Sequence, residues 1–267
     1  RQAQLRSLEA SFGEPLFHRT GRKLVLTDAG RVVYRYAQEI FSLGAELEAY
    51  MAGTGQGAIH ARLRVGIADV VPKLVAHHIL QPAIEPEGVE VGLVCFEGKP
   101  STLFSQLATY ELDAVISDVP IGPQHNVRAF NHLLGESGIT WFAHPDIAPE
   151  LRKGFPGSLA DAACLLPTDN TAVRRDLNRW FTSQDLQPNA VAEFEDSALL
   201  KVFGMDGVGA FTAPTVIEDD VRDQYGAEVI GRVPEVRERF YVVSVERRVQ
   251  NAAVAAIVEA ARERLFD

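Results

Sequence analysis

Cationic side chains are concentrated in the first 35 residues of this 267-residue chain, and their chemistry is the binding of polyanions. They are Arg1, Arg6, Arg19, Arg22, Lys23, Arg31 and Arg35. Only three acids accompany them, so this end carries +4, whereas the whole chain carries −10. Such asymmetry favours a nucleic-acid-binding end joined to an acidic body. The alternative is a basic surface helix that is merely solvated.

The segment that would position these cations is predicted to be a helix, a hairpin and a second helix. Apolar residues at helical spacing stop at Gly13, a residue type that often ends a helix. Two short apolar runs, residues 16–17 and 24–26, then flank a cationic turn, as in a β-hairpin. Thr27 is a candidate N-cap for a long second helix. This order predicts the end of a winged helix-turn-helix, unless it is an ordinary amphipathic helix followed by a hairpin.

The wing of such a domain lies along the phosphate backbone, whereas the start of its recognition helix reads base edges. The candidate DNA contacts of the wing are His18, Arg19, Thr20, Arg22 and Lys23. Those of the helix are Arg1, Gln2 and Gln4.

Three blocks of this segment resemble, in order and spacing, the N-terminal signature of LysR-type transcriptional regulators. They are residues 4–9, residues 12–19 and residues 26–30. The resemblance implies an α/β protein: a winged helix-turn-helix remnant plus a long linker helix, then a two-lobed periplasmic-binding-protein-like (type 2) effector module. It also implies that a first helix and the start of the recognition helix precede Arg1, so we expect the chain to be N-terminally incomplete.

The long helix after Thr27 carries one apolar stripe with alternating spacings of three and four residues. The stripe consists of Val33, Tyr36, Ile40, Leu43, Leu47 and Tyr50. Such a heptad seam over a helix of about 39 Å predicts dimerisation with a second copy of the chain. LysR-like proteins dimerise through this helix, which favours that interpretation over a helix that packs on its own domain.

The remainder alternates strands and helices, which indicates parallel sheets covered by helices. The predicted strands are residues 62–68, 89–96, 112–117, 127–134, 138–144, 164–166, 190–194, 208–213 and 240–245. The predicted helices are residues 70–80, a helix opened by Pro100, and residues 158–163, 171–186, 197–204 and 249–266. The second strand is almost continuously apolar and is therefore expected to be buried on both faces.

The family resemblance divides the chain into parts. The winged helix-turn-helix takes residues 1–26, and the linker helix with its flexible connector takes residues 27–57. Lobe I takes residues 61–117 and 241–267, and lobe II takes residues 118–240. The chain is expected to cross between the lobes at residues 117–121 and again near residues 240–245.

Ligands of open α/β sheets bind where parallel strands end and helices begin. Three such turns would face the cleft between the lobes, and the crossing strands would line its floor. The predicted effector-binding residues are Ala68, Asp69, Pro100, Ser101, Thr102, Ser117, Asp118, Thr168, Asn170 and Thr171. Each hydroxyl among them could equally serve as a helix cap.

Within the family, the chain resembles regulators of sodium/proton antiporter genes, through blocks at residues 65–69, 112–121 and 192–204. That resemblance implies an activator of antiporter and stress-response genes that answers to sodium or lithium. Hard cations prefer oxygen ligands. The best-placed oxygens belong to Asp69, Asp118, Glu195, Asp196, Ser101 and Thr168.

Several classes of protein are disfavoured. No nucleophile elbow, phosphate loop or zinc-binding motif occurs, so we expect no enzyme, no cofactor and no metal centre. No apolar run reaches the ~20 residues of a membrane span. Cys95 and Cys164 lie in apolar runs and are expected to be buried free thiols in a reducing compartment, the cytoplasm.

The expected partners are double-stranded DNA at a promoter operator, a small effector, RNA polymerase and further copies of the chain, as a homodimer or homotetramer. Three rival interpretations remain open. They are a regulator whose effector is an organic anion, a transporter solute-binding protein, and an α/β enzyme with a helical appendage.

Overall fold

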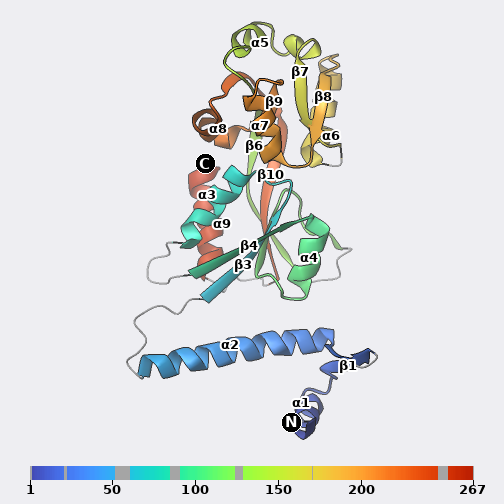
Figure 1. The fold of residues 1–267 in the computed structure, drawn as a ribbon, viewed down its shortest axis with the longest axis vertical. Helices are drawn as coiled ribbons and strands as arrows, with labels where there is room; N and C mark the ends of the chain where they lie inside the picture. The colour runs from blue at the N-terminus through green and yellow to red at the C-terminus, as the bar shows by residue number, and fades with distance from the viewer. Residues whose placement is uncertain are drawn as a thin grey trace.

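The computed structural model describes residues 2–20, 23–51, 61–84, 91–123, 129–169, 171–245 and 252–266, in a head followed by a body (Figure 1). The head contains α1 (Gln2–Phe12), β1 (Phe17–Thr20), β2 (Lys23–Leu26) and α2 (Asp28–Met51). The first half of the body contains β3 (Ala61–Ala68), α3 (Lys73–Ile84), β4 (Val91–Gly98), α4 (Pro100–Ala108), β5 (Ala114–Ser117), β6 (Phe130–Ala143), α5 (Ala148–Gly154) and η2 (Gly157–Ala160). The second half contains β7 (Ala163–Pro167), α6 (Ala172–Ser183), β8 (Asn189–Phe194), α7 (Ser197–Met205), β9 (Phe211–Pro214), η3 (Thr215–Ile217), α8 (Glu218–Tyr225), β10 (Glu228–Ser244) and α9 (Ala252–Leu265).

The helix–hairpin–helix order predicted for the head is confirmed. Strands β1 and β2 pair antiparallel, with Phe17 opposite Leu26. Gly13 ends α1 with a positive φ of 72°, a backbone conformation that glycine adopts without steric cost. The Thr27 hydroxyl accepts a hydrogen bond from the Gly30 amide at 2.9 Å, as an N-cap does.

Helix α2 is fixed to the hairpin by a close backbone approach at its first turn. A Cβ atom on Gly30 would lie 1.9 Å from the Leu16 carbonyl oxygen, so only glycine fits at this crossing. The Thr27 amide donates to that same carbonyl at 3.0 Å, and the Leu16 side chain is buried. On the other side, the Glu9 carboxylate accepts from the Leu16 amide at 2.8 Å. The hairpin therefore holds a defined orientation between the two helices.

The body is organised around a six-stranded sheet in the order β4-β3-β5-β10-β6-β9. Strands β4, β3 and β5 run parallel, as the alternation of strands and helices predicted. Strand β10 runs antiparallel to both β5 and β6, and β6 runs antiparallel to β9. A second, two-stranded parallel sheet is formed by β7 and β8.

The two strands that join the lobes are longer than the sequence suggested. The predicted strands at 127–134 and 138–144 belong to one strand, β6, and the predicted strand at 240–245 is only the end of β10. These two strands pair along most of their length, from Glu228 opposite Ala143 to Ser244 opposite Phe130 (Figure 1). The first crossing is therefore made by β6 and not by residues 117–121. The exact lobe boundaries stay predictions.

Strand β4 corrects a second expectation. It lies at the edge of the six-stranded sheet, and Cys95, Phe96 and Glu97 on it are exposed. The apolar run of this strand predicted that both of its faces, and Cys95 with them, are buried. Of the two cysteines that were expected to be buried, only Cys164 is. The sequence pattern also missed α5 and α8, and residues 157–160 form only a short 3-10 turn where a helix was expected.

Two apolar cores hold the body together. The larger core joins α3, α4 and α9 to the six-stranded sheet and continues into the second lobe through Phe142, Phe211 and Ile217. The smaller core lies wholly in the second lobe, around Trp141, Trp180 and Phe181. Among the described residues, no helix has both the length and the apolar composition that a bilayer crossing requires.

We expect Phe240→Ala to destabilise the body by about 3–5 kcal/mol, since Phe240 is fully buried and its ring stacks on that of Phe266, with 5.7 Å between centroids. Urea unfolding measures the loss. The matched variant Leu199→Ala removes an exposed side chain and should change the free energy of unfolding by less than about 0.5 kcal/mol. Equal losses in the two variants would contradict the described core.

Candidate functional site

The first candidate surface is the basic head. Gln4, His18 and Arg19 are exposed, on α1 and on the first strand of the hairpin. The backbone of Gln2, Thr20 and Lys23 lies in α1, β1 and β2, and nothing further is described for these side chains. Arg1 and Arg22 lie outside the described residues. An exposed strand that carries Arg19 beside a helix end can contact a phosphate backbone.

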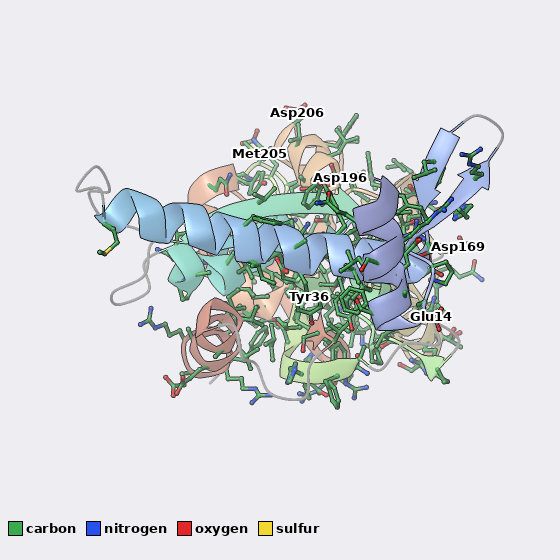
Figure 2. The ribbon with its side chains drawn as sticks, turned by 90° about the horizontal axis from the view of Figure 1, so that it is seen from below. Glu14, Tyr36, Asp169, Asp196, Met205 and Asp206 are labelled. Carbon is green, nitrogen blue, oxygen red and sulfur yellow. The ribbon has the colours of Figure 1, made fainter. Side chains whose placement is uncertain are left out.

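Helix α2 presents large apolar side chains that the rest of its own chain does not bury. Of the predicted seam, Tyr36 and Ile40 are 48% and 66% exposed, and Val33 is half-buried. Phe41 is also exposed, at 77%. The side chains of Leu43, Leu47 and Tyr50 lie outside the described part of the helix. Figure 2 looks onto this helix, with Tyr36 labelled.

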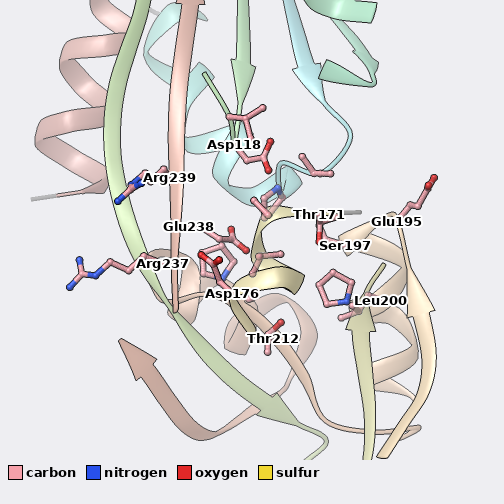
Figure 3. Close-up of a pocket in the computed structure, with 18 of the residues that line it drawn as sticks. Asp118, Thr171, Asp176, Glu195, Ser197, Leu200, Thr212, Arg237, Glu238 and Arg239 are labelled. Carbon is pink, nitrogen blue, oxygen red and sulfur yellow. The ribbon is translucent and has the colours of Figure 1, made fainter. Parts of the chain in front are cut away.

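The second candidate site is a cleft in the body, formed by two adjoining cavities of about 230 and 320 Å³. Both cavities are lined by Val70, Asp118, Val119, Thr171 and Glu195, so they adjoin each other. The larger cavity reaches the turns after β3 and β4. The smaller one, which Figure 3 shows, reaches β10 and α7.

Most of the predicted effector residues meet in this cleft. Its walls include Asp69, Pro100, Ser101, Asp118, Thr168 and Thr171. Among the remaining predicted residues, Ala68 and Ser117 are buried next to the cleft, and Thr102 is exposed on α4 without lining either cavity. Asn170 lies outside the described residues.

Two of the predicted hydroxyl groups are already used by the backbone. The Thr171 hydroxyl accepts from the Arg174 amide at 3.2 Å and donates to the Thr168 carbonyl at 3.0 Å, which makes it the N-cap of α6. The Ser117 hydroxyl accepts from the Val119 amide at 3.2 Å. Of the predicted carboxylates, Asp196 caps α7 and does not line the cleft.

Three ionisable groups of the cleft floor have shifted pKa values. Burial raises the pKa of Asp118 above its usual range, and the nearby Asp69 adds to the rise. Burial also raises the pKa of Glu238, to about 8, and the charge of Asp118 contributes to that shift. Lys201 is only 2% exposed, and its burial lowers the pKa of its ammonium group. Shifted groups of this kind mark functional sites more often than ordinary surfaces.

Glu238 and Lys201 were missed by the sequence analysis. Glu238 stands between Arg237 and Arg239, so the sequence pattern indicates one more solvent-exposed residue in a run of charged residues. Because successive side chains of a strand alternate in direction, the middle residue of such a run faces away from its neighbours. Lys201 offered a usable signal, since it is the one charged residue of α7, a helix otherwise rich in apolar side chains.

The comparisons with known proteins agree with this architecture. Residues 2–31 match the bacterial regulatory helix-turn-helix protein, lysR family, and residues 56–266 match the LysR substrate binding domain. The chain therefore belongs to the LysR family and is a transcriptional regulator with a DNA-binding part and an effector-binding part.

Among the individual relatives, the transcriptional activator protein NhaR of Escherichia coli is 34% identical over 264 residues, which cover 98% of this chain and 85% of NhaR. Two solved structures show the same fold at 16% identity. ArgP from Mycobacterium tuberculosis aligns with a TM-score of 0.64 over 99% of this chain and 88% of its own. LysG from Corynebacterium glutamicum, solved with bound effector Arg, aligns with a TM-score of 0.60 over 100% and 89%. The relatives are regulators and not enzymes.

We expect the stability of the chain to fall as the pH rises from about 5 towards 8, because the folded state keeps a proton on Glu238 that the unfolded state has lost. Glu238→Gln removes the contribution of Glu238 to this dependence, leaving that of Asp118, and should stabilise the chain at pH 8 by on the order of 1–3 kcal/mol, with little effect at pH 5. Urea unfolding at both pH values measures the difference. Glu235→Gln, an exposed residue of the same strand, is the control and should follow the parent chain.

Proposed function

We propose that this LysR-type regulator responds to sodium or lithium and activates antiporter and stress-response genes. The observation that carries the proposal is the pair of partly buried carboxyl groups, Asp118 and Glu238, that line the same cavity and whose pKa values burial raises. When ionised, Asp118 and Glu238 attract a cation, whereas the neighbouring cations Arg175 and Lys201 attract an anion, so an organic anion stays the alternative effector. The extent of the similarity to NhaR, over 98% of this chain, supports the choice of target genes.

The proposed DNA contacts are those of the head. Arg19, together with Arg22 and Lys23, would contact phosphates along the hairpin, and residues of α1 would lie nearest the base edges. The exposed apolar side chains of α2, such as Ile40 and Phe41, favour pairing of two copies through this helix. A homodimer would place two heads on one operator, and a homotetramer four. As an activator in the cytoplasm, the assembly would then contact RNA polymerase at the promoter.

The proposed mechanism is a shift between two arrangements of the lobes. A cation held in the cleft would favour the arrangement that surrounds it most closely, and so change the spacing of the heads or the bend of the DNA. Effects of this type amount to about 1–3 kcal/mol, or about 5- to 150-fold in affinity.

A direct test measures binding of the full chain to DNA from its neighbouring promoter, by gel shift and footprinting, at constant ionic strength in sodium, lithium, potassium and choline chloride. We expect sodium or lithium to change the affinity or the footprint by about fivefold or more. Constant ionic strength is essential because DNA affinity depends steeply on salt. Identical binding in all the salts would contradict the proposed effector.

A second test concerns the hairpin. Arg19→Ala should weaken binding to specific and unrelated DNA alike and reduce the slope of log affinity against log salt by about 1, since one phosphate contact is lost. Lys153→Ala, an exposed cation of α5, is the matched control and should leave the slope unchanged. An unaltered slope in Arg19→Ala would remove this strand from the DNA interface.

A further inference from the structure

The two lobes also meet outside the cleft, where α8 lies next to α3 (Figure 1). Helix α3 follows β3 in the first lobe, and α8 follows β9 in the second. A side-chain hydrogen bond joins the two helices, since His78 Nε2 and Asp220 Oδ2 are 2.9 Å apart. The two residues lie 142 positions apart in the chain, so only the fold brings them together. Their side chains are 32% and 36% exposed, which leaves the pair accessible to solvent protons.

The pair accompanies an apolar contact between the same two helices. Ile217, directly before α8, and Val221 within it are fully buried in the same core as Val75 of α3. Val221 is the neighbour of Asp220, and Val75 lies one helical turn before His78. The apolar side chains carry no charge and therefore bring the helices together at any pH. The His78–Asp220 pair adds a contact that a proton can change.

The chemistry of the imidazole ring sets the direction of that change. A neutral imidazole has one donor nitrogen and one acceptor nitrogen, whereas a protonated ring donates from both and carries a positive charge. A hydrogen bond between two charged groups is roughly twice as strong as one between neutral groups. Histidine side chains change their charge between about pH 5 and about pH 8. The contact between α3 and α8 is therefore expected to strengthen as the pH falls through this range.

Most charged groups on the surrounding elements are paired elsewhere or exposed. Three ion pairs lie on or beside α3 and α8: Lys73 with Glu97, Asp219 with Arg222, and Glu218 with Arg232. The other titratable groups on α3, on α8 and on the elements that pack against α3 are His77, Cys95, Asp223, Tyr225, Glu259, Arg262, Glu263 and Arg264. Of this second set only Tyr225 is not exposed. Among the three acids in the first turn of α8, Asp220 is thus the one that contacts His78, while the other two have arginine partners.

We propose that the His78–Asp220 pair is a proton-dependent tie between the two lobes. A proton on His78 strengthens the tie and favours the arrangement of the lobes that the structure shows, and loss of the proton makes it easier for α8 to move away from α3. Both are positioning residues, since neither lines the cleft. The inference goes beyond the proposed function, because it requires no effector. Under the proposed mechanism, pH would be a second input to the same movement of the lobes.

The test is hydrogen–deuterium exchange of the full chain without effector, in potassium chloride at about pH 6 and about pH 8.5, on either side of the usual histidine titration. Exchange is corrected for the intrinsic pH dependence of amide exchange. His78→Gln and Asp220→Asn should each lower the protection of the α8 amides about two- to fivefold relative to the parent chain at the lower pH, and less at the higher pH. Comparison at equal pH removes the contribution of Glu238, which all these chains share.

His78→Lys gives the opposite result, because a lysine keeps its charge at both pH values. This variant should match the parent chain at the lower pH and exceed its protection about two- to fivefold at the higher pH. A purely structural contact predicts no such gain.

Two neighbouring substitutions are the controls, and circular dichroism verifies that every variant is folded. His77→Gln changes the exposed histidine next to His78, and Asp219→Asn removes an acid from the same first turn of α8, where it has a similar effect on the helix dipole. Both should follow the parent chain.

Three outcomes would overturn the proposal. Unchanged protection in His78→Gln would show that the pair does not tie the lobes, and an equal loss at both pH values would show that the tie does not depend on a proton. An equal effect of Asp219→Asn and Asp220→Asn would assign the result to the end of the helix. None of these outcomes bears on the response to sodium, which is measured through DNA binding, so the two proposals can fail separately.

Discussion

The body of this regulator depends on one constraint, the antiparallel pairing of β6 with β10 through both lobes. Backbone pairing of this length fixes the two lobes as neighbours. The register of the pair is interrupted between Val233 and Glu238, which face Ile139 and Ser137, so β10 carries extra residues here. Bulges of this kind bend a strand and redirect its side chains, often beside functional sites. The irregularity that permits bending between the lobes therefore also presents Glu238 to the cleft.

Helix α7 connects this cleft to the outer surface of the second lobe. Its inner face buries Leu200 and Lys201, and its outer face exposes Leu199, Val202 and Phe203. The buried ammonium responds to the charge of the cleft, because Glu238 is its foremost electrostatic partner. A change in that charge alters the free energy of placing α7 against the cleft floor.

Local signals in the sequence predicted local structure well, and non-local pairing poorly. Gly13, Thr27 and Thr171 end or cap helices through contacts within a few residues, and each was identifiable from its type and position. The full lengths of β6, with 14 residues, and β10, with 17 residues, were not identifiable from the sequence. Glycines and charged residues interrupt the apolar pattern of both strands, and only the pairing with the other strand shows that each one continues. For the same reason the sequence located the cleft turns, including Asp69 and Ser101, but not Glu238.

The carboxyl groups in the cleft lower the stability of the native state, and a role in binding an effector would explain why a regulator keeps them. A carboxyl group that keeps its proton near neutrality, beside a second carboxyl with an unsatisfied oxygen, lowers the stability of the native state at the pH where the protein works. Replacing both by apolar residues would remove that cost, yet it would also remove the difference in free energy between the empty and occupied cleft. A ligand shifts a conformational equilibrium only by as much as it prefers one state to the other. If the cleft holds an effector as proposed, the arrangement of the lobes in which that effector satisfies the buried Asp118 Oδ1 atom would be favoured over the other, and this difference would set the size of the response.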